Sequence, residues 1–331
     1  MKQDYPGVSK KNLCTLFGKT RHALYDHQYR QQQDILKDDI ILQYVYQIRS
    51  QLPRLGTRKL LYKLMPLLKE HGIKTGRDYL FSLLDDHNLL IRQRKRKAIT
   101  TNSRHWMRKY DNLVKDMVCT RPEQLWVSDI TFIRMGNHWG YLSLVTDAYS
   151  RKIMGYSLRT DMTTQGCLEA LRMALGNRMY PHQSLIHHSD RGSQYCSSQY
   201  VQLLADNRIA ISMTQNGDPY ENALAERMNG ILKGEFNLYS NLHGLTQTSQ
   251  LVAASIEAYN QERPHSSCDF LTPVQAHLQE GLLKKRWKKY PYKTVKTNED
   301  SSKKELGRLP LQSNDPALFY EKTKQTHIFD H

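Results

Sequence analysis

The middle of the chain carries an ordered series of strand and helix patterns that few folds can accommodate. Three stretches rich in β-branched and aromatic residues come first, at 125–133, 139–146 and 153–158. Helical spacing at 164–179, a strand at 185–189, helical spacing at 197–207 and a strand at 210–214 follow, before another helix begins near Asp218. The order β-β-β-α-β-α-β-α predicts an α/β fold in which helices flank a mixed five-stranded sheet.

Charge is distributed unevenly along the 331 residues, whose formal net charge is +16. Residues 1–121 hold 25 Lys and Arg against 11 Asp and Glu, residues 122–280 hold 11 against 15, and residues 281–331 hold 12 against 6. Basic surface favours polyanions, because neutralising phosphates releases counterions, whereas a site for divalent cations should be acidic. The sequence therefore predicts nucleic-acid-binding arms around an acidic middle domain.

Two helical hairpin patterns precede the acidic domain. The first has a capping Ser9 and a stop at Gly18 before a second helix, and the next combines a helix with leucines over 60–68 and a capped helix over 75–84. Each is typical of a helix-turn-helix, although many such hairpins only pack against a neighbour. The second pattern is followed by a basic run that favours DNA contact, made up of Arg92, Arg94, Lys95, Arg96 and Lys97.

These patterns divide the chain into five predicted segments. They are a helix-turn-helix-like region at 1–50, a second such domain with the basic run at 51–98, a linker at 99–121, the α/β domain with its trailing helices at 122–280, and a basic polar tail at 281–331. No stretch approaches the roughly 18 apolar residues of a membrane helix, and the N-terminus lacks a secretory signal. Five scattered cysteines without a Cys-x-x-Cys pair indicate reduced thiols. We expect a soluble, cytoplasmic protein without a membrane partner.

Three acids stand where this fold would present them to a common site. Asp129 lies within an apolar strand, where an unpaired charge is costly to bury. Asp190 directly follows the strand at 185–189, at the carboxyl end where open α/β sheets place their sites. Glu226 lies in the helix that follows residue 218. Asp147, at the end of another strand, is interpreted as a turn-capping residue or an arginine partner rather than a metal ligand.

The helix that carries Glu226 has a polar arc opposite an apolar stripe, at roughly 100° per residue. The arc contains Asn222, Glu226, Asn229 and Lys233. It could present the acid to a site, but an ordinary solvated helix face has the same pattern.

Four ordered blocks resemble bacterial insertion-sequence transposases with a retroviral-integrase-type core, and the nearest group is insertion-sequence family three. The blocks are 126–131 (WVSDIT), 145–151 (VTDAYSR), 188–195 (HSDRGSQY) and 221–226 (ENALAE) through Lys233. Asp190 and Glu226 are separated by 35 residues, the spacing of that family's Asp-Asp-Glu triad. The resemblance extends less specifically to the N-terminal hairpins and to 259–265. The sequence departs from the pattern at Ser128, where threonine is usual, and at Arg227, where serine is frequent.

The resemblance implies an RNase-H-like core in which Asp129, Asp190 and Glu226 hold two Mg²⁺ ions, which Mn²⁺ can replace. Water would attack at a transposon end and free a 3′ hydroxyl, which would then attack another phosphodiester, so no covalent protein intermediate is needed. Carboxylates without Cys or His ligands suit magnesium. Contacts with DNA are expected from Lys233, Arg191 and Asn229, in addition to the basic run at 92–97.

The implied partners are the inverted repeats at the element's ends, target DNA and other copies of the chain assembled on DNA. Family members are also made as fusions with a short upstream helix-turn-helix frame, so fusion to or partnership with such a protein is possible. Two alternatives remain at this stage. One is a DNA-binding regulator with a relic integrase core, and the other is an RNase-H-like nuclease that acts on RNA-containing duplexes.

Overall fold

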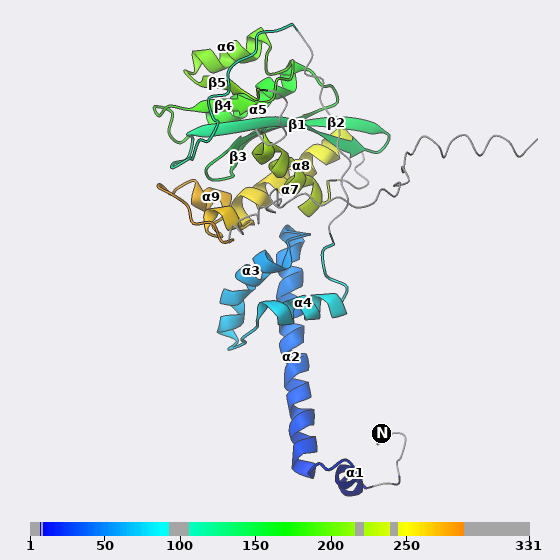
Figure 1. Cartoon of the computed structure of the whole chain (residues 1–331). Coiled ribbons are helices and arrows are strands. Elements are labelled where there is room, and N and C mark those ends of the chain that lie inside the picture. Colours follow the sequence, from blue (N-terminus) through cyan, green and yellow to red (C-terminus); the bar gives the residue numbers. More distant parts are fainter. Residues whose placement is uncertain (1–6, 8, 93–105, 216–221, 239–243, 288–331) are drawn as a thin grey trace, which may run out of the picture. The chain divides into compact units, whose positions relative to one another are not determined.

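In the computed structural model, which describes residues 7, 9–92, 106–215, 222–238 and 244–287, the acidic domain is built on one five-stranded sheet. Its strands follow the order β3-β2-β1-β4-β5 (Figure 1). They are β1 (Leu125–Met135), β2 (His138–Asp147), β3 (Ile153–Arg159), β4 (Ile186–Ser189) and β5 (Ala210–Met213). The first three strands are antiparallel neighbours, whereas β4 runs parallel to β1 and β5 parallel to β4. The predicted mixed sheet and the predicted order of elements are confirmed, and the core is RNase-H-like.

Helices cover both faces of this sheet. Helices α5 (Thr164–Gly176) and α6 (Ser198–Asp206) lie on one face, and α7 (Ala223–Glu235) and α8 (Leu245–Glu262) lie on the other (Figure 1). Trp126 and Leu171 belong to the core on the α5 side, whereas Ile133 and Met228 belong to the core on the α7 side. Because successive strand residues point to opposite faces, β1 contributes apolar side chains to both cores. A strand buried on both faces therefore positions everything else in the domain.

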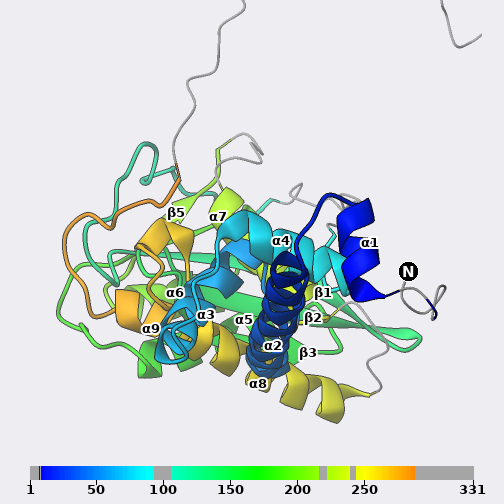
Figure 2. The same cartoon turned by 90° about the horizontal axis from the view of Figure 1, so that it is seen from below.

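The N-terminal helices pack against one another. They are α1 (Lys10–Leu16), α2 (Arg21–Gln51), α3 (Thr57–Glu70) and α4 (Arg77–Asp86). Helices α3 and α4 confirm the second hairpin pattern. The first pattern gives a different result, because its second helix continues for 31 residues and its last part, from Ile41, packs with α3 and α4 (Figures 1 and 2). The domain boundary predicted at residue 50 thus falls inside a shared core of Val45, Leu64 and Leu80.

The part of the predicted linker that the structure describes, 106–121, packs along the α/β domain without forming a helix or a strand. Met213 at the end of β5 donates its amide to the Asp111 carbonyl at 3.2 Å, and the Leu113 amide donates to Ser212 Oγ at 2.9 Å. Tyr110 and Val114 pack against the hydrophobic cores. These contacts cover the outer edge of β5, where unpaired backbone groups would otherwise invite another strand.

The segment after α8 is fastened to the sheet by polar groups from the 259–265 block. Asn260 accepts from the Ile153 amide at 2.9 Å and donates to the Ile153 carbonyl at 3.0 Å, which completes the hydrogen bonding at the start of β3. Arg263, 1% exposed, donates to both carboxylate oxygens of Glu235 at 2.7 and 2.6 Å. This block therefore joins α8 to β3 and to the end of α7. The 3-10 helix η1 (Ser266–Cys268) and α9 (Pro273–Ala276) follow it.

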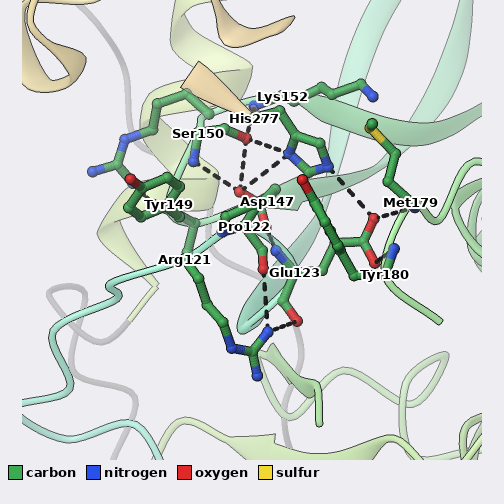
Figure 3. Close-up of polar contacts among 12 residues, drawn as sticks. Arg121, Pro122, Glu123, Asp147, Tyr149, Ser150, Lys152, Met179, Tyr180 and His277 are labelled. Atoms are coloured by element: carbon green, nitrogen blue, oxygen red, sulfur yellow. Dashed lines mark hydrogen bonds and ion pairs between the residues drawn. The ribbon is translucent and has the colours of Figure 1, made fainter. Parts of the chain in front are cut away.

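A buried polar cluster connects the start of β1 with α9 (Figure 3). Glu123 is fully buried and accepts from the Met179 and Tyr180 amides at 2.6 and 3.1 Å and from Arg178 Nε at 3.2 Å. Burial alone would raise the pKa of Glu123, but these bonds and one with His277 lower it to about 2. The carboxylate is therefore charged and saturated with donors.

Asp147 and His277 form the other half of the cluster (Figure 3). Asp147 Oδ1 accepts from the Ser150 amide and hydroxyl, both at 2.7 Å, which agrees with its predicted role as a turn cap. His277 Nδ1 lies 2.9 Å from Ser150 Oγ, and its Nε2 lies 3.4 Å from Glu123 Oε1. Because the Ser150 hydroxyl donates to Asp147 and the Glu123 oxygen can only accept, both ring nitrogens of His277 are suited to carry protons.

No helix among the described residues combines the length and the apolar character needed to cross a bilayer.

Gly155 in β3 allows α5 to approach the sheet closely. A Cβ atom at this position would lie 2.1 Å from the Ala170 carbonyl oxygen and 2.6 Å from the Ala174 amide nitrogen, both of which are backbone atoms. We expect Gly155→Ala to lower the free energy of unfolding by about 2 to 4 kcal/mol, because α5 must shift. Gly176→Ala, where nothing lies within 4 Å, should be neutral or slightly stabilising. Urea denaturation checks both, and equal stability of the two variants would contradict the packing argument.

The Glu123–His277 contact makes stability depend on pH. Burial alone would lower the pKa of His277, but hydrogen bonds with Asp147 and Glu123 raise it above 6.5. The stabilisation from protonated His277 is thus complete below about pH 6.5 and is lost as the pH rises through the folded-state pKa. His277→Gln should therefore lower the thermal midpoint more at pH 6 than at pH 8.5, whereas the exposed His182→Gln should change neither. An equal loss at both pH values would mean that His277 is neutral.

Candidate active site

The candidate site lies where β4 ends beside β1. The two strands are paired only through Leu125↔Ile186, Trp126↔His187 and Val127↔His188. Beyond this point β1 continues to Met135 along β2, and its other edge pairs with no strand among the residues that the structure describes. Asp129 and Asp190 are the residues that follow this divergence on the two strands. The sheet topology therefore brings together two acids that are 61 positions apart in the sequence.

Asp129 is partly buried and both of its carboxylate oxygens are hydrogen-bonded. Oδ1 accepts from the Ile130 amide at 2.9 Å, and Oδ2 accepts from Asn229 Nδ2 of α7 at 2.7 Å. These bonds fix the carboxylate against the helix that carries Glu226. No cationic side chain is hydrogen-bonded to it in the described part of the chain, so neutral donors alone stabilise its charge.

Asp190 is held by the tight loop that follows it. Its Oδ1 accepts from the Gly192 amide at 3.0 Å. A Cβ atom on Gly192 would lie 2.9 Å from that same oxygen, so any other residue would press against the carboxylate. The glycine in the HSDRGSQY block thus has a local explanation, because it allows the backbone to approach and orient the acid.

Glu226 stands in the first turn of α7 with an exposed side chain. The rest of its predicted polar arc differs from the expectation, because Asn222 and Asn229 are each only 6% exposed. Asn222 donates to the Ser128 carbonyl at 3.2 Å and Asn229 to Asp129, so this side of the helix faces β1. Asn229, predicted to contact DNA, donates its side-chain amide to the Asp129 carboxylate. The arc was misread because hydropathy does not distinguish a polar contact inside the protein from one with water.

The three acids influence one another electrostatically. Burial, then the charge of Asp190 and, more weakly, that of Glu226 raise the pKa of Asp129 from 3.8 to about 7, against the opposing bonds from Ile130 and Asn229. The ionised form of a carboxyl group in this position is disfavoured unless a positive charge lies beside it. The site is therefore electrostatically prepared for a cation.

Oxygen donors from carboxylates are what magnesium takes, and in this chemical sense the residues fit the ion. Within the residues that the structure describes, however, no three His, Cys, Asp or Glu side chains lie close enough together to hold one metal ion. The exposed Glu226 side chain would have to turn inward to share an ion with Asp129 and Asp190.

The remaining predicted residues lie in different surroundings. Lys233 in the last turn of α7 and Arg191 beside Asp190 are both partly buried, whereas Arg92 is exposed at the end of the segment that follows α4. The other members of the basic run lie outside the described residues; they are Arg94, Lys95, Arg96 and Lys97. His188, considered as a possible neighbour of the site, has its Nδ1 2.8 Å from Ser212 Oγ, which joins β4 to β5.

Sequence reasoning missed a buried group directly behind the acids. Ser128 Oγ lies 2.7 Å from His187 Nε2, and the Tyr200 hydroxyl lies 2.9 Å from the same nitrogen. Burial, with a contribution from His188, lowers the pKa of His187 to about 3, so its imidazole is neutral. The sequence shows only that Ser128 precedes Asp129 and that His187 stands three positions before Asp190. These positions do not indicate that the two side chains meet across strands.

Comparison with known families identifies the class of protein to which this core belongs. A model described as "Integrase core domain" matches residues 119–219, and a second model with the same description matches residues 207–273. Together they span the sheet, the three acids and the segment after α8. The integrase catalytic core domain of HTLV-2, solved in complex with magnesium, has a TM-score of 0.37 and 20% identity, covering 47% of this chain and 97% of that one. The chain contains an integrase-type catalytic core.

Curated relatives identify the family more closely. The uncharacterized 31 kDa protein of insertion element IS600 from Shigella sonnei is 32% identical over 79% of this chain and 96% of its own length. The transposase of IS629 from the same species is 30% identical over 74% of this chain and 80% of that protein. The InsF transposase of IS3A from Escherichia coli K12 is 37% identical over 49% of this chain and 57% of that protein. The chain belongs to the IS3-type family of bacterial insertion-sequence transposases.

The raised pKa of Asp129 predicts that the acid destabilises the metal-free protein. The loss of folding free energy from burying the charged carboxyl group is absent below about pH 4, grows between pH 4 and pH 7, and is constant above pH 7. This is because the folded-state pKa lies above the unfolded one. We expect Asp129→Asn to raise the free energy of unfolding by about 1 to 3 kcal/mol at pH 8 in EDTA, with no gain at pH 4. Urea denaturation at the two pH values measures this. A destabilised variant at pH 8 would contradict it.

Proposed function

We propose that this transposase cleaves and joins DNA at the ends of its insertion sequence, with Asp129, Asp190 and Glu226 as the catalytic acids and two Mg²⁺ ions as cofactors. Water attacks the phosphodiester at an element end, the P–O3′ bond breaks, and a 3′ hydroxyl is freed. That hydroxyl then attacks a phosphodiester of the second DNA. A new bond forms between the attacking 3′ oxygen and the target phosphorus, and the target's own 3′ oxygen leaves. Each step exchanges one phosphodiester oxygen for another.

The observation that supports this proposal is the electrostatic influence on Asp129 of acids from two other elements. Asp129 of β1 feels the charge of Asp190 after β4 and of Glu226 in α7, and its pKa is raised to about 7. A structural acid is stabilised by hydrogen-bond donors and cations beside it. This carboxyl group instead lies near other carboxyl groups, which lowers the stability of the folded protein. Perturbed acids of this kind mark functional sites more often than structural ones.

Magnesium, when bound, would supply positive charge to the phosphoryl oxygens and lower the pKa of a bound water. Asp129 and Asp190 would hold it with oxygens already oriented by Ile130, Asn229 and Gly192. Glu226 would complete the set from α7. Mn²⁺ has the same preference for oxygen ligands and should replace it.

DNA is the proposed partner of the basic surfaces. Arg191 adjoins Asp190 and Lys233 lies two turns beyond Glu226 on α7, so both are near enough to meet phosphates beside the cut. The basic run that begins at Arg92, together with the N-terminal helices, would hold the element's inverted repeats. We also propose assembly of several copies on DNA, and cooperation with a short upstream helix-turn-helix protein.

A regulator with a relic core is less consistent with these observations. The free-energy cost of keeping Asp129 close to Asp190 and Glu226 would serve no purpose in a protein that only binds DNA, because a neutral side chain would be more stable there.

Replacing any of the three acids tests the proposal. We expect Asp129→Asn, Asp190→Asn and Glu226→Gln each to reduce strand cleavage and joining at least 1,000-fold, of the order seen when a catalytic group is removed, while binding to element ends stays within about twofold. The assays are cleavage of a labelled duplex that carries the inverted repeat flanking the coding region, and a gel shift with the same duplex. Asp206→Asn, an exposed acid at the end of α6, is the control. Full activity of Asp190→Asn would refute the assignment.

A further inference from the structure

Ser128 is hydrogen-bonded to two elements that carry the other proposed acids. Its hydroxyl oxygen lies 2.7 Å from His187 Nε2 in β4, and its carbonyl accepts from Asn222 Nδ2 at 3.2 Å at the start of α7. All three side chains are buried, with exposures of 1%, 1% and 6% for Ser128, His187 and Asn222. Each member stands within four positions of one acid, since Asp129 follows Ser128, Asp190 follows His187 by three residues and Glu226 follows Asn222 by four.

The backbone ladder does not extend to this point. Pairing of β1 with β4 ends at Val127↔His188, so Ser128 is the first β1 residue without a partner in β4. Asp129 and Asp190, which come next on the two strands, repel each other as anions. The Ser128–His187 contact is therefore a side-chain link at the position where the strands begin to separate.

Tyr200 contacts the same ring nitrogen of His187 as Ser128 does. Its hydroxyl lies 2.9 Å from His187 Nε2, and the two rings meet edge to face with centroids 5.4 Å apart. Tyr200 belongs to α6 and is 1% exposed. Tyr200 thus ties the imidazole that contacts the Ser128 hydroxyl to the helix layer that covers this face of the sheet.

We propose that Ser128 is a positioning residue that sets the relative placement of the three acids and thereby the affinity of the site for divalent metal. The inference rests on the proposed function, because it assumes that Asp129, Asp190 and Glu226 act on a common metal centre. Ser128 touches neither metal nor DNA in this role. It acts through His187 on the strand before Asp190 and through Asn222 on the helix that bears Glu226.

The link should matter more for metal binding than for folding. A chelating site loses affinity when its ligands can drift apart, and removal of groups that orient ligands commonly costs 10- to 100-fold in metal affinity or activity. Loss of one buried hydroxyl changes overall stability by a modest amount in comparison. A variant at Ser128 therefore separates the two effects if its metal dependence is compared with that of a buried serine elsewhere in the sheet.

The experiment uses the full chain and Mg²⁺ as the probe. Two midpoints are measured for each variant: the Mg²⁺ concentration for half of the metal-induced rise in thermal midpoint, and that for half-maximal strand cleavage. We expect Ser128→Ala to raise both about 10-fold, and Ser128→Thr, which keeps the hydroxyl, to stay within about twofold of the parent protein. Binding to element ends should not change.

Ser143→Ala is the matched control. Ser143 is also buried in the sheet, in β2, but its hydroxyl contacts Cys167 Sγ at 3.7 Å and none of the three linked residues. Its loss should lower the thermal midpoint by a similar amount and leave both Mg²⁺ midpoints unchanged. Equal Mg²⁺ midpoints for Ser128→Ala and Ser143→Ala would overturn the inference.

Two further variants keep the outcomes distinct. If Ser128→Ala does not fold, Asn222→Ala cuts the other link without opening the sheet interior; a higher Mg²⁺ midpoint supports the inference and an unchanged one overturns it. Asp190→Asn tests the proposed function itself. If it keeps normal Mg²⁺ stabilisation and cleavage, the metal site is misassigned. If it loses both while Ser128→Ala keeps the parent midpoints, only the positioning role fails.

Discussion

The place where β4 stops determines the rest of the catalytic domain. Strand β1 is paired with β2 from Trp126 to Met135, but with β4 only as far as Val127. Among the described residues, those that follow on β1 and β4 therefore lie where the two strands are no longer paired. Helix α7 closes one side of this opening. A mixed sheet with strands of unequal length creates the site before any particular acid is considered.

Two groups of buried acids in the same domain show how surroundings decide what a carboxylate does. Glu123 receives two backbone amides, Arg178 and His277, and its pKa falls to about 2. Asp129 receives one amide and one Asn side chain, stands beside other acids, and its pKa rises to about 7. The first group fastens the start of β1 to α9 and contributes to stability. In the second the charged carboxyl group is disfavoured, and this difference distinguishes Asp129 from the structural acids.

The polar side of α7 faces the strand that carries Asp129. It was expected to face away from the core, yet Asn222 and Asn229 are buried and point their amides at β1, while Glu226 between them remains exposed. The two asparagines hold the helix to the strand that carries Asp129. Glu226 is thus carried on a helix that two buried hydrogen bonds join to β1. A polar helix face can serve as an interface when its partner is itself a polar site.

The amino-acid sequence by itself determined the order of elements and the mixed sheet, because strand and helix periodicity are local properties, and it proposed the three acids, because the Asp-x(60)-Asp-x(35)-Glu series lies in recognisable blocks. It also indicated that Asp147 caps a turn. It did not determine the 31-residue length of α2, the packing of 106–121 along β5, the burial of Asn229 or the contact of Ser128 with His187. These were decided by tertiary structure, since each depends on which residues meet across distances of tens of positions. Local patterns contain no information about such meetings, because the same side chain satisfies the same periodicity whether it faces water or another strand.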